Sequence, residues 1–343
     1  MPKHLATSIA AAVFLSACGA NSPLDPGSSS PQSADFAGEP ALETDQATLD
    51  ANLMCTGFTH PDKPPVLLVH GTFTNGEEQY TWTYLPLLAD RGFDVCTVTY
   101  PDRGLGDQQI SAEYVVNALR KIHALSGRKV AMIGHSQGAS MPRWALKWWK
   151  SARDATEDFV LEAGPNHGTT RASLGVPLPT GMPAAFWQFQ PDSQFVAAVN
   201  RDDETPGEVS YTSIYTTMDE LVQPVTPIPT AALDLGLDNP NVSNLHLQEI
   251  CPSRFVDHLT IGTTDRLAFE LTLDAITNPG PANVERAGGA SVLCGLADFI
   301  PDQVIAPEIA QGMLSVLLDE MMNPPPVSAH LTTEEPPLKP YAQ

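Results

Sequence analysis

The stretch Lys129-Val-Ala-Met-Ile-Gly134-His135-Ser136-Gln137-Gly138 decides the fold class of this chain. It begins as a short apolar run, which is typical of a buried parallel strand, and continues through Gly-x-Ser-x-Gly into a helical pattern over residues 138–149. A serine on such a strand–turn–helix is exposed at the carboxyl edge of the sheet, and its flanking glycines avoid collisions. The helix would direct backbone N–H groups towards a developing oxyanion. We therefore predict that Ser136 is a nucleophile.

Strand and helix patterns alternate along the rest of the chain. Apolar residues at helical spacing over 111–125 predict a helix. Further strands are predicted where apolar or β-branched residues run together, at residues 66–69, 94–99, 159–161 and 210–215. This alternation implies an α/β fold, with a mostly parallel central sheet and helices on both faces. We expect one catalytic domain over residues 49–343, with its chemistry at the carboxyl ends of the strands.

Composition excludes several classes of protein. The chain has 343 residues and a formal net charge of −22, and 42% of its residues are hydrophobic. It is therefore too apolar to be disordered, and it is long enough to bury a large core. The acidic balance argues against nucleic acid as a partner, because phosphates need a basic face. It also argues against electrostatic docking on anionic lipid.

The N-terminal residues have a pattern that is typical of a bacterial export signal. Lys3 precedes an apolar run that is too short to span a bilayer, and the segment Leu15-Ser-Ala-Cys18 resembles the lipobox, in which the chain is cut before a cysteine that receives lipid. We expect a signal peptide over 1–17, lipidation of Cys18 and an acidic, Ser/Pro-rich flexible linker over 18–48. An ordinary signal peptide is the alternative. The protein would be exported and lipid-anchored to the cell envelope, at the outer membrane or the cell surface, or released from it.

The five cysteines are an odd number, so at least one lies outside any intramolecular disulfide. If Cys18 carries lipid, the other four are exported and free to pair. They are Cys55, Cys96, Cys251 and Cys294. Their spacing alone leaves all three connectivities open.

A serine nucleophile needs a histidine to take its proton and a carboxylate to hold the imidazole, and in this fold the chain order is Ser, acid, His. Asp219 is the predicted acid, because it follows the predicted strand 210–215 at the active edge. His258, late in the chain, is the favoured base, and His167 and His246 are the alternatives. Five other aspartates lie in polar stretches and are expected to be solvated: Asp192, Asp202, Asp203, Asp234 and Asp238.

Several segments together resemble the Candida lipase B type of α/β-hydrolase. The most specific is Ser213-Ile-Tyr-Thr-Thr-Met-Asp-Glu-Leu-Val-Gln-Pro224, which is similar to the acid loop of that family. Cys251-Pro-Ser-Arg-Phe-Val-Asp-His258 resembles its histidine loop. Further matches are its lead-in to the first half-cystine at 49–55, its oxyanion strand and loop at 65–72, and part of its C-terminal segment at 338–342. The resemblance covers residues 49 to about 342.

The resemblance implies roles for particular residues. Ser136 would be the nucleophile, His258 the base and Asp219 its orienter. The backbone N–H groups of Thr72 and Gln137, with the Thr72 hydroxyl, would form the oxyanion hole. The implied disulfides join Cys55 to Cys96 and Cys251 to Cys294.

Departures from the family concern the surroundings of the site. His135 stands where the family has a tryptophan in its alcohol-side pocket, His70 replaces a proline, and Asn166 replaces an acid. The predicted pocket residues are His135, Asn166, Leu221 and Val222. A smaller, polar residue at 135 should alter alcohol specificity. We also predict a mobile cover over 174–189 and a helix over 302–322.

These inferences predict a serine ester hydrolase, a lipase or carboxylesterase, that cleaves esters such as acylglycerols through an acyl-enzyme on Ser136. We expect a monomer without metal or organic cofactor, whose partners are the ester or lipid substrate and the membrane that holds its anchor. The same triad could act on polyesters or bulky secondary-alcohol esters. A calcium-dependent lipase is a further alternative, because such enzymes also carry His-Gly and Gly-His-Ser-Gln-Gly. A surface lipoprotein that only binds is the alternative from another class.

Overall fold

The computed structural model describes residues 36–174, 181–300 and 331–343. The predicted signal peptide 1–17, the lipidation site Cys18, linker residues 18–35 and the predicted helix 302–322 lie outside the described residues. The predicted cover 174–189 is described only in part. No helix in the described ranges combines the length and the apolar character needed to span a membrane.

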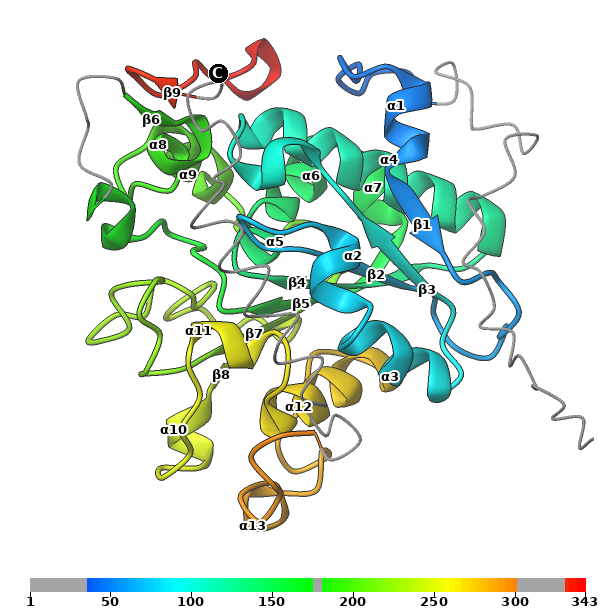
Figure 1. Ribbon diagram of the computed structural model, residues 1–343, viewed down its shortest axis with the longest axis vertical. Coiled ribbons are helices and arrows are strands. Elements are labelled where there is room, and N and C mark those ends of the chain that lie inside the picture. Colours follow the sequence, from blue (N-terminus) through cyan, green and yellow to red (C-terminus); the bar gives the residue numbers. More distant parts are fainter. Residues whose placement is uncertain (1–35, 175–180, 301–330) are drawn as a thin grey trace, which may run out of the picture.

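Among the described residues, a seven-stranded sheet forms the centre of the molecule (Figure 1). Its order is β1-β3-β2-β4-β5-β7-β8, and only β1 runs antiparallel to its neighbour. The strands are β1 (Leu53–Cys55), β2 (Val66–Val69), β3 (Val95–Val98), β4 (Val130–His135), β5 (Thr156–Glu162), β7 (Ser210–Tyr215) and β8 (Val242–His246). β2, β3 and β4 are buried along their whole length, as expected for parallel strands covered on both faces. The predicted α/β-hydrolase fold class is therefore confirmed.

Two apolar clusters cover the two faces of the sheet. Leu67 of β2 lies in the cluster that includes Trp144, whereas its neighbour Leu68 lies in the cluster that includes Phe269. Successive strand residues point to opposite faces, so one short strand supplies both clusters. Figure 1 shows α4, α6 and α7 on one side of the sheet and α3 and α12 on the other.

The remaining elements connect and flank these layers. The helices are α1 (Gln46–Ala51), α2 (Gly76–Tyr80), α3 (Tyr84–Asp90), α4 (Gln108–Ser126), α5 (Gln137–Ser140), α6 (Pro142–Trp148), α7 (Lys150–Asp154), α8 (Ala184–Gln188), α9 (Gln194–Asn200), α10 (Leu247–Ile250), α11 (His258–Ile261), α12 (Arg266–Thr277) and α13 (Ala290–Leu293). Short 3-10 turns occur at Pro101–Gly104, Thr170–Leu174 and Pro340–Ala342. β6 (Met182–Pro183) and β9 (Leu331–Thr332) pair separately as a small antiparallel ribbon.

Two sequence-based expectations about elements differ from the structure. The single helix predicted over 138–149 is divided into α5 and α6, because Pro142 has no N–H to continue the helical hydrogen bonds. The edge strand β8 has no predicted counterpart. Four of its five residues are only partly buried, so it lacks the apolar run that identifies the central strands.

The N-terminal boundary of the domain also differs from the predicted one. Glu39 accepts hydrogen bonds from Arg120 Nη2 and Ser151 Oγ, both at 2.7 Å. The Pro40 carbonyl accepts a hydrogen bond from Trp149 Nε1 at 2.8 Å. Residues 36–48, which the sequence assigned to the flexible linker, therefore contact the domain. Their composition is that of a linker, and only these distant partners show that they are packed.

Two disulfides join the pairs that the resemblance implied. Cys55 and Cys96 lie opposite each other on β1 and β3, and their disulfide links these strands. Cys251 and Cys294 connect the loop before His258 to the end of α13.

Candidate active site

Ser136 lies on a sharp turn between β4 and α5. Its φ of 57° and ψ of −121° form a conformation that residues other than glycine rarely adopt. Both flanking glycines are required by close packing: a Cβ at Gly134 would lie 1.8 Å from the Gly138 carbonyl oxygen, and a Cβ at Gly138 would lie 2.1 Å from the Val69 carbonyl oxygen. The predicted strand–turn–helix is therefore present, and the first turn of α5 follows the serine directly.

His258 connects Ser136 to Asp219. Its Nε2 lies 2.9 Å from Ser136 Oγ, and its Nδ1 lies 2.9 Å from Asp219 Oδ2. A carboxylate only accepts hydrogen bonds, so Nδ1 carries the proton and Nε2 accepts from the serine hydroxyl. Both side chains are buried, with His258 5% and Asp219 2% exposed. This is the arrangement in which a histidine can act as a general base towards a serine.

The neighbouring backbone fixes the acid and the base. Asp219 Oδ1 accepts the N–H groups of Leu221 at 2.9 Å and Val222 at 2.7 Å. The N–H of His258 donates to Glu220 Oε2 at 3.1 Å. His258 begins α11, where Asp257 and Thr260 form a capping box.

The two alternative histidines lie elsewhere. His167 Nε2 contacts Glu204 Oε1 at 2.8 Å, and its Nδ1 donates to the carbonyl of Thr230. His246, at the end of β8, stacks on Tyr215 and contacts Glu249 at 3.1 Å. Of the three histidines considered from the sequence, His258 alone lies within hydrogen-bonding distance of Ser136.

Thr72 and Gln137 lie together beside the serine. A Cβ at Gly71 would be 3.3 Å from Ser136 Cβ, so the loop that follows β2 approaches the nucleophile closely. Thr72 Oγ1 donates to Gln137 Oε1 at 3.0 Å, and Gln137 Nε2 donates to the Gly104 carbonyl at 2.9 Å. Neither backbone N–H of this pair has an acceptor among the described residues. Within the described part of the chain, the protein therefore leaves both of these N–H groups without an acceptor of their own.

The four predicted pocket residues have different surroundings. Asn166 is buried; its Nδ2 donates to the Ala231 carbonyl, and its Oδ1 has no partner among the described residues. Leu221 is 52% exposed, whereas Val222 is buried. His135 is buried beside His258, with ring centroids 5.0 Å apart, and burial lowers its pKa to about 3.

Two buried side chains near the site were not found from the sequence. Gln79 of α2 bonds to Gly71 and His135, which lie eight and 56 residues away in the chain. Glu162 ends β5, where its carboxyl accepts from Tyr84 Oη and Thr272 Oγ1, and burial raises its pKa to about 8. Its carbonyl accepts the N–H of Ser136 at 2.9 Å. No local pattern marks either residue, because all these partners are distant in sequence.

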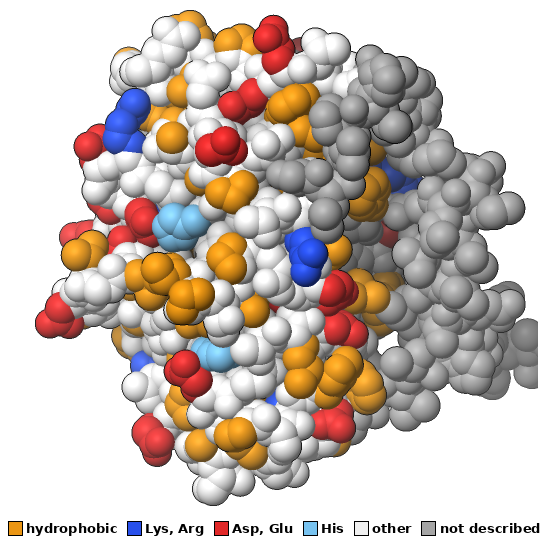
Figure 2. All heavy atoms as spheres, turned by 90° about the vertical axis from the view of Figure 1, so that its left-hand side faces the viewer, with side chains coloured by type: hydrophobic (Ala, Val, Ile, Leu, Met, Phe, Trp, Pro, Cys, Tyr) orange, Lys and Arg blue, Asp and Glu red, His pale blue; other side chains and the backbone are white. Residues whose placement is uncertain are grey.

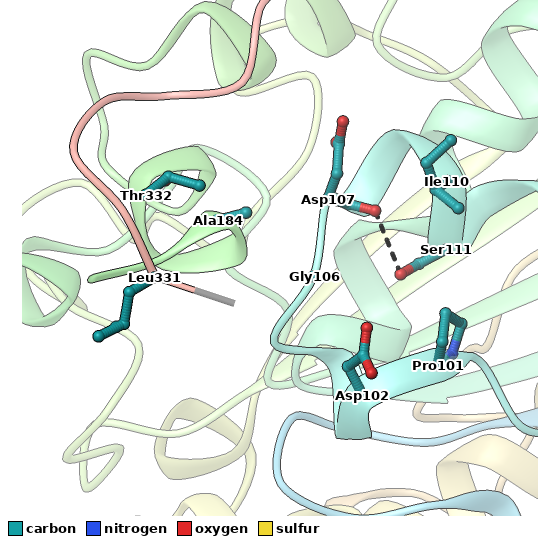
Figure 3. Close-up of a pocket in the computed structure, with 9 residues that line it drawn as sticks. All are labelled: Pro101, Asp102, Gly106, Asp107, Ile110, Ser111, Ala184, Leu331 and Thr332. Carbon is teal, nitrogen blue, oxygen red and sulfur yellow. Dashed lines mark hydrogen bonds between the residues drawn. The ribbon is translucent and has the colours of Figure 1, made fainter. Parts of the chain in front are cut away.

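A separate cavity of about 320 Å³ opens between the start of α4 and the β6–β9 ribbon (Figure 3). Asp102, Asp107 and Ser111 line one side, with Ala184 and Leu331 opposite. The Asp107 carboxylate is already bonded to Gln188 and Gln109. None of the predicted site residues lines this cavity. In the described ranges, no three His, Cys, Asp or Glu side chains are grouped so that they could hold a metal ion.

Comparison with known proteins agrees with this fold. Residues 66–306 match the Alpha/beta hydrolase family. This chain belongs to that family. The α/β-hydrolase is also 30% identical to "Lipase B" of Pseudozyma antarctica over 226 residues, which are 64% of this chain and 64% of that lipase.

A solved structure extends the likeness. The crystal structure of Aspergillus fumigatus lipase B is similar to this α/β-hydrolase with a TM-score of 0.77 and 29% sequence identity. The match covers 90% of this chain and 74% of that one. The resemblance inferred from sequence segments therefore extends to the whole arrangement of the sheet and its helices.

Proposed function

We propose that this α/β-hydrolase is a lipase or carboxylesterase that cleaves carboxylic esters through an acyl-enzyme on Ser136. The observation that carries the proposal is the continuous line of hydrogen bonds from Ser136 Oγ through His258 to Asp219. The similarity to two lipases supports the same class of reaction.

Acylation follows from this geometry. Ser136 Oγ attacks the ester carbonyl carbon while His258 Nε2 takes the hydroxyl proton. The carbonyl oxygen becomes negative and is stabilised by the N–H groups of Thr72 and Gln137, and Asp219 stabilises the imidazolium. The intermediate collapses when the carbon–oxygen bond to the alcohol breaks and His258 gives its proton to the departing oxygen. The acyl group remains on Ser136.

Hydrolysis repeats these steps with water. His258 removes a proton from a water molecule as its oxygen attacks the acyl carbon, and the same N–H groups hold the oxyanion. The bond to Ser136 Oγ then breaks, and His258 returns its proton to the serine. The carboxylic acid leaves, and the enzyme is restored.

Apolar surroundings support an apolar ester as substrate. Three segments that hold the oxyanion, acid and base residues each expose large hydrophobic side chains. We call these exposed side chains the apolar rim, and they belong to Phe73, Met218, Leu221, Phe255 and Leu259. Figure 2 views the side of the molecule on which α10 and α11 lie in Figure 1, and hydrophobic side chains form several patches there.

The proposal is tested by a serine-directed phosphonate and a panel of esters of graded acyl length. We expect stoichiometric labelling of the native protein, hydrolysis of apolar esters, and loss of both in a folded Ser136→Ala variant, by at least about 10³-fold in kcat. A native protein that is neither labelled nor active would refute the enzymatic function and leave the binding-only alternative.

We also propose that the protein is exported and lipidated on Cys18. The two disulfides support export, because disulfides persist in oxidising compartments. Cells fed a labelled fatty acid should incorporate it into the wild-type protein and not into a Cys18→Ser variant. Equal incorporation into both proteins would contradict lipidation at this position.

A further inference from the structure

Three hydrogen bonds connect the oxyanion loop to the base through two buried side chains. The N–H of Gly71, the residue before Thr72, donates to Gln79 Oε1 at 2.8 Å. Gln79 Nε2 lies 3.1 Å from His135 Nδ1. His135 Nε2 lies 2.7 Å from the His258 carbonyl oxygen. Neither Gln79 nor His135 is more than 6% exposed.

The direction of these hydrogen bonds is fixed from both ends. The backbone N–H of Gly71 can only donate, so Gln79 presents its oxygen to Gly71 and its amide nitrogen to His135. The carbonyl of His258 can only accept, so the proton of His135 lies on Nε2. His135 Nδ1 is then the acceptor that the Gln79 amide requires. A neutral ring satisfies both hydrogen bonds of His135, and burial favours the neutral form.

Close packing holds the His135 ring in this position. A Cβ at Gly262, just after α11, would lie 2.1 Å from His135 Cδ2. The ring therefore occupies space that only a glycine at 262 leaves free. His135 also precedes Ser136 directly, so one residue is joined covalently to the nucleophile and by a hydrogen bond to the backbone of the base.

We propose that Gln79 and His135 are positioning residues that fix the oxyanion loop and His258 relative to Ser136. The inference rests on the proposed function and deepens it. Asp219 restrains the imidazole of His258, whereas His135 restrains the backbone from which that imidazole projects. Gln79 extends the restraint to the loop whose N–H group would donate a hydrogen bond to the oxyanion. Small errors in such placement are costly, because the reacting groups must meet at short distances.

Two substitutions at His135 separate hydrogen bonding from packing. His135→Phe keeps a ring and removes both bonds, and we expect kcat to fall about 10- to 100-fold with KM within about twofold. His135→Gln places an amide nitrogen near the Nε2 position and can donate to His258, so we expect recovery to within about threefold of wild type. Thermal unfolding verifies that both variants are folded. Unchanged kcat in folded His135→Phe, or an equal loss in both variants, would overturn the proposal.

A double-mutant cycle tests whether the two side chains act together. Gln79→Met should lower kcat as His135→Phe does, and the double variant should lose little more than either single variant, because each breaks the same chain. The matched control is Gln46→Met on α1, an exposed glutamine that also bonds through its amide. Full additivity of the two losses would contradict a shared restraint.

A spectroscopic measurement tests the hydrogen-bond chain separately from the proposed activity. In ¹⁵N-labelled native protein, we expect His135 to be protonated on Nε2 alone between about pH 5 and 9. Protonation on Nδ1 would overturn the hydrogen-bond chain even if the protein hydrolyses esters. Conversely, absence of phosphonate labelling would refute the proposed function while this tautomer still tested the chain.

Discussion

At the residue scale, the hydrogen bonds of Asp219 hold its carboxylate against the imidazole of His258. It is 2% exposed, and it accepts from His258 and from two backbone N–H groups of its own loop. Its orientation is therefore fixed before any substrate arrives. The exposed aspartates downstream of Ser136, such as Asp192, have no such arrangement with His258.

Asp219→Asn tests this role. The asparagine amide can donate an N–H to His258 Nδ1. This favours the tautomer of His258 with its proton on Nε2. Nε2 can then no longer accept a proton from Ser136. We expect kcat to fall about 10³- to 10⁴-fold with the fold intact. Asp192→Asn is the matched control and should change kcat less than about twofold. Comparable losses in both variants would argue against Asp219 as the orienter.

The buried carboxyl group of Glu162 should make the stability of the folded protein depend on pH. Burial raises the pKa of its carboxyl to about 8 in the folded protein, above its ordinary value of 4.5. Its neutral form therefore favours folding below about pH 4.5, and this contribution is lost as pH rises towards 8. Glu162→Gln keeps an acceptor for Tyr84 and Thr272 without a charge to bury.

We accordingly expect Glu162→Gln to match the wild type near pH 4.5 and to exceed it in unfolding free energy at pH 9. The difference should be on the order of a few kcal/mol. Denaturant unfolding at a series of pH values measures it. A difference that does not vary with pH would show that Glu162 ionises in the folded state as readily as in the unfolded one.

At the element scale, the turn between β4 and α5 depends on two glycines for reasons of packing. Gly138→Ala would place a methyl group 2.1 Å from the Val69 carbonyl oxygen, so β2 and α5 would have to separate. We expect a loss of about 3 kcal/mol or more in stability, or failure to fold. Gly295→Ala, whose nearest contact would be 3.4 Å, is the control and should be nearly neutral. Equal melting temperatures in the two variants would contradict this account.

The two disulfides close loops in different parts of the fold. Cys251–Cys294 closes 43 residues around the base, and Cys55–Cys96 closes 41 residues around β2. Loops of this length predict similar losses of about 4 kcal/mol when either pair is replaced by alanine. Because Cys251 precedes His258 by only seven residues, removal of its pair should also lower kcat. Chemical denaturation measures the loss of stability in the two double variants, and initial rates measure the loss of kcat. Equal kcat values in the two variants would argue against a specific effect of Cys251–Cys294 on the base.

At the scale of the whole molecule, the net charge of −22 and the apolar rim have opposing effects at a lipid surface. The charge disfavours anionic lipid, so we expect contact with the proposed ester substrate at a lipid surface to depend on the exposed hydrophobic side chains. Phe255 and Leu259 are 67% and 48% exposed on the segment that bears the base.

Replacing Phe255 and Leu259 together by glutamine should lower hydrolysis of an emulsified long-chain ester by about tenfold, because less apolar surface is buried on contact. Hydrolysis of a dissolved short-chain ester should change far less. Leu125→Gln, at the end of α4, is the control for loss of an exposed leucine. Rates that fall equally on both substrates would indicate damage to the site rather than weaker adsorption.

The amino-acid sequence was enough to predict the alternation of strands and helices and the turn that carries Ser136. The loops of Asp219 and His258 were singled out by the family resemblance as well as by their position in the chain. The strands, the helices and the turn are contiguous patterns, so local physics is sufficient to predict them. Folding settled the features that depend on contacts between segments far apart in the chain. It brought His258 to Ser136 across 122 residues, packed residues 36–48 onto the domain, and buried Glu162 between Tyr84 and Thr272. It also placed Gln79 against His135, because complementary donors and acceptors meet only once the sheet has aligned the ends of its strands.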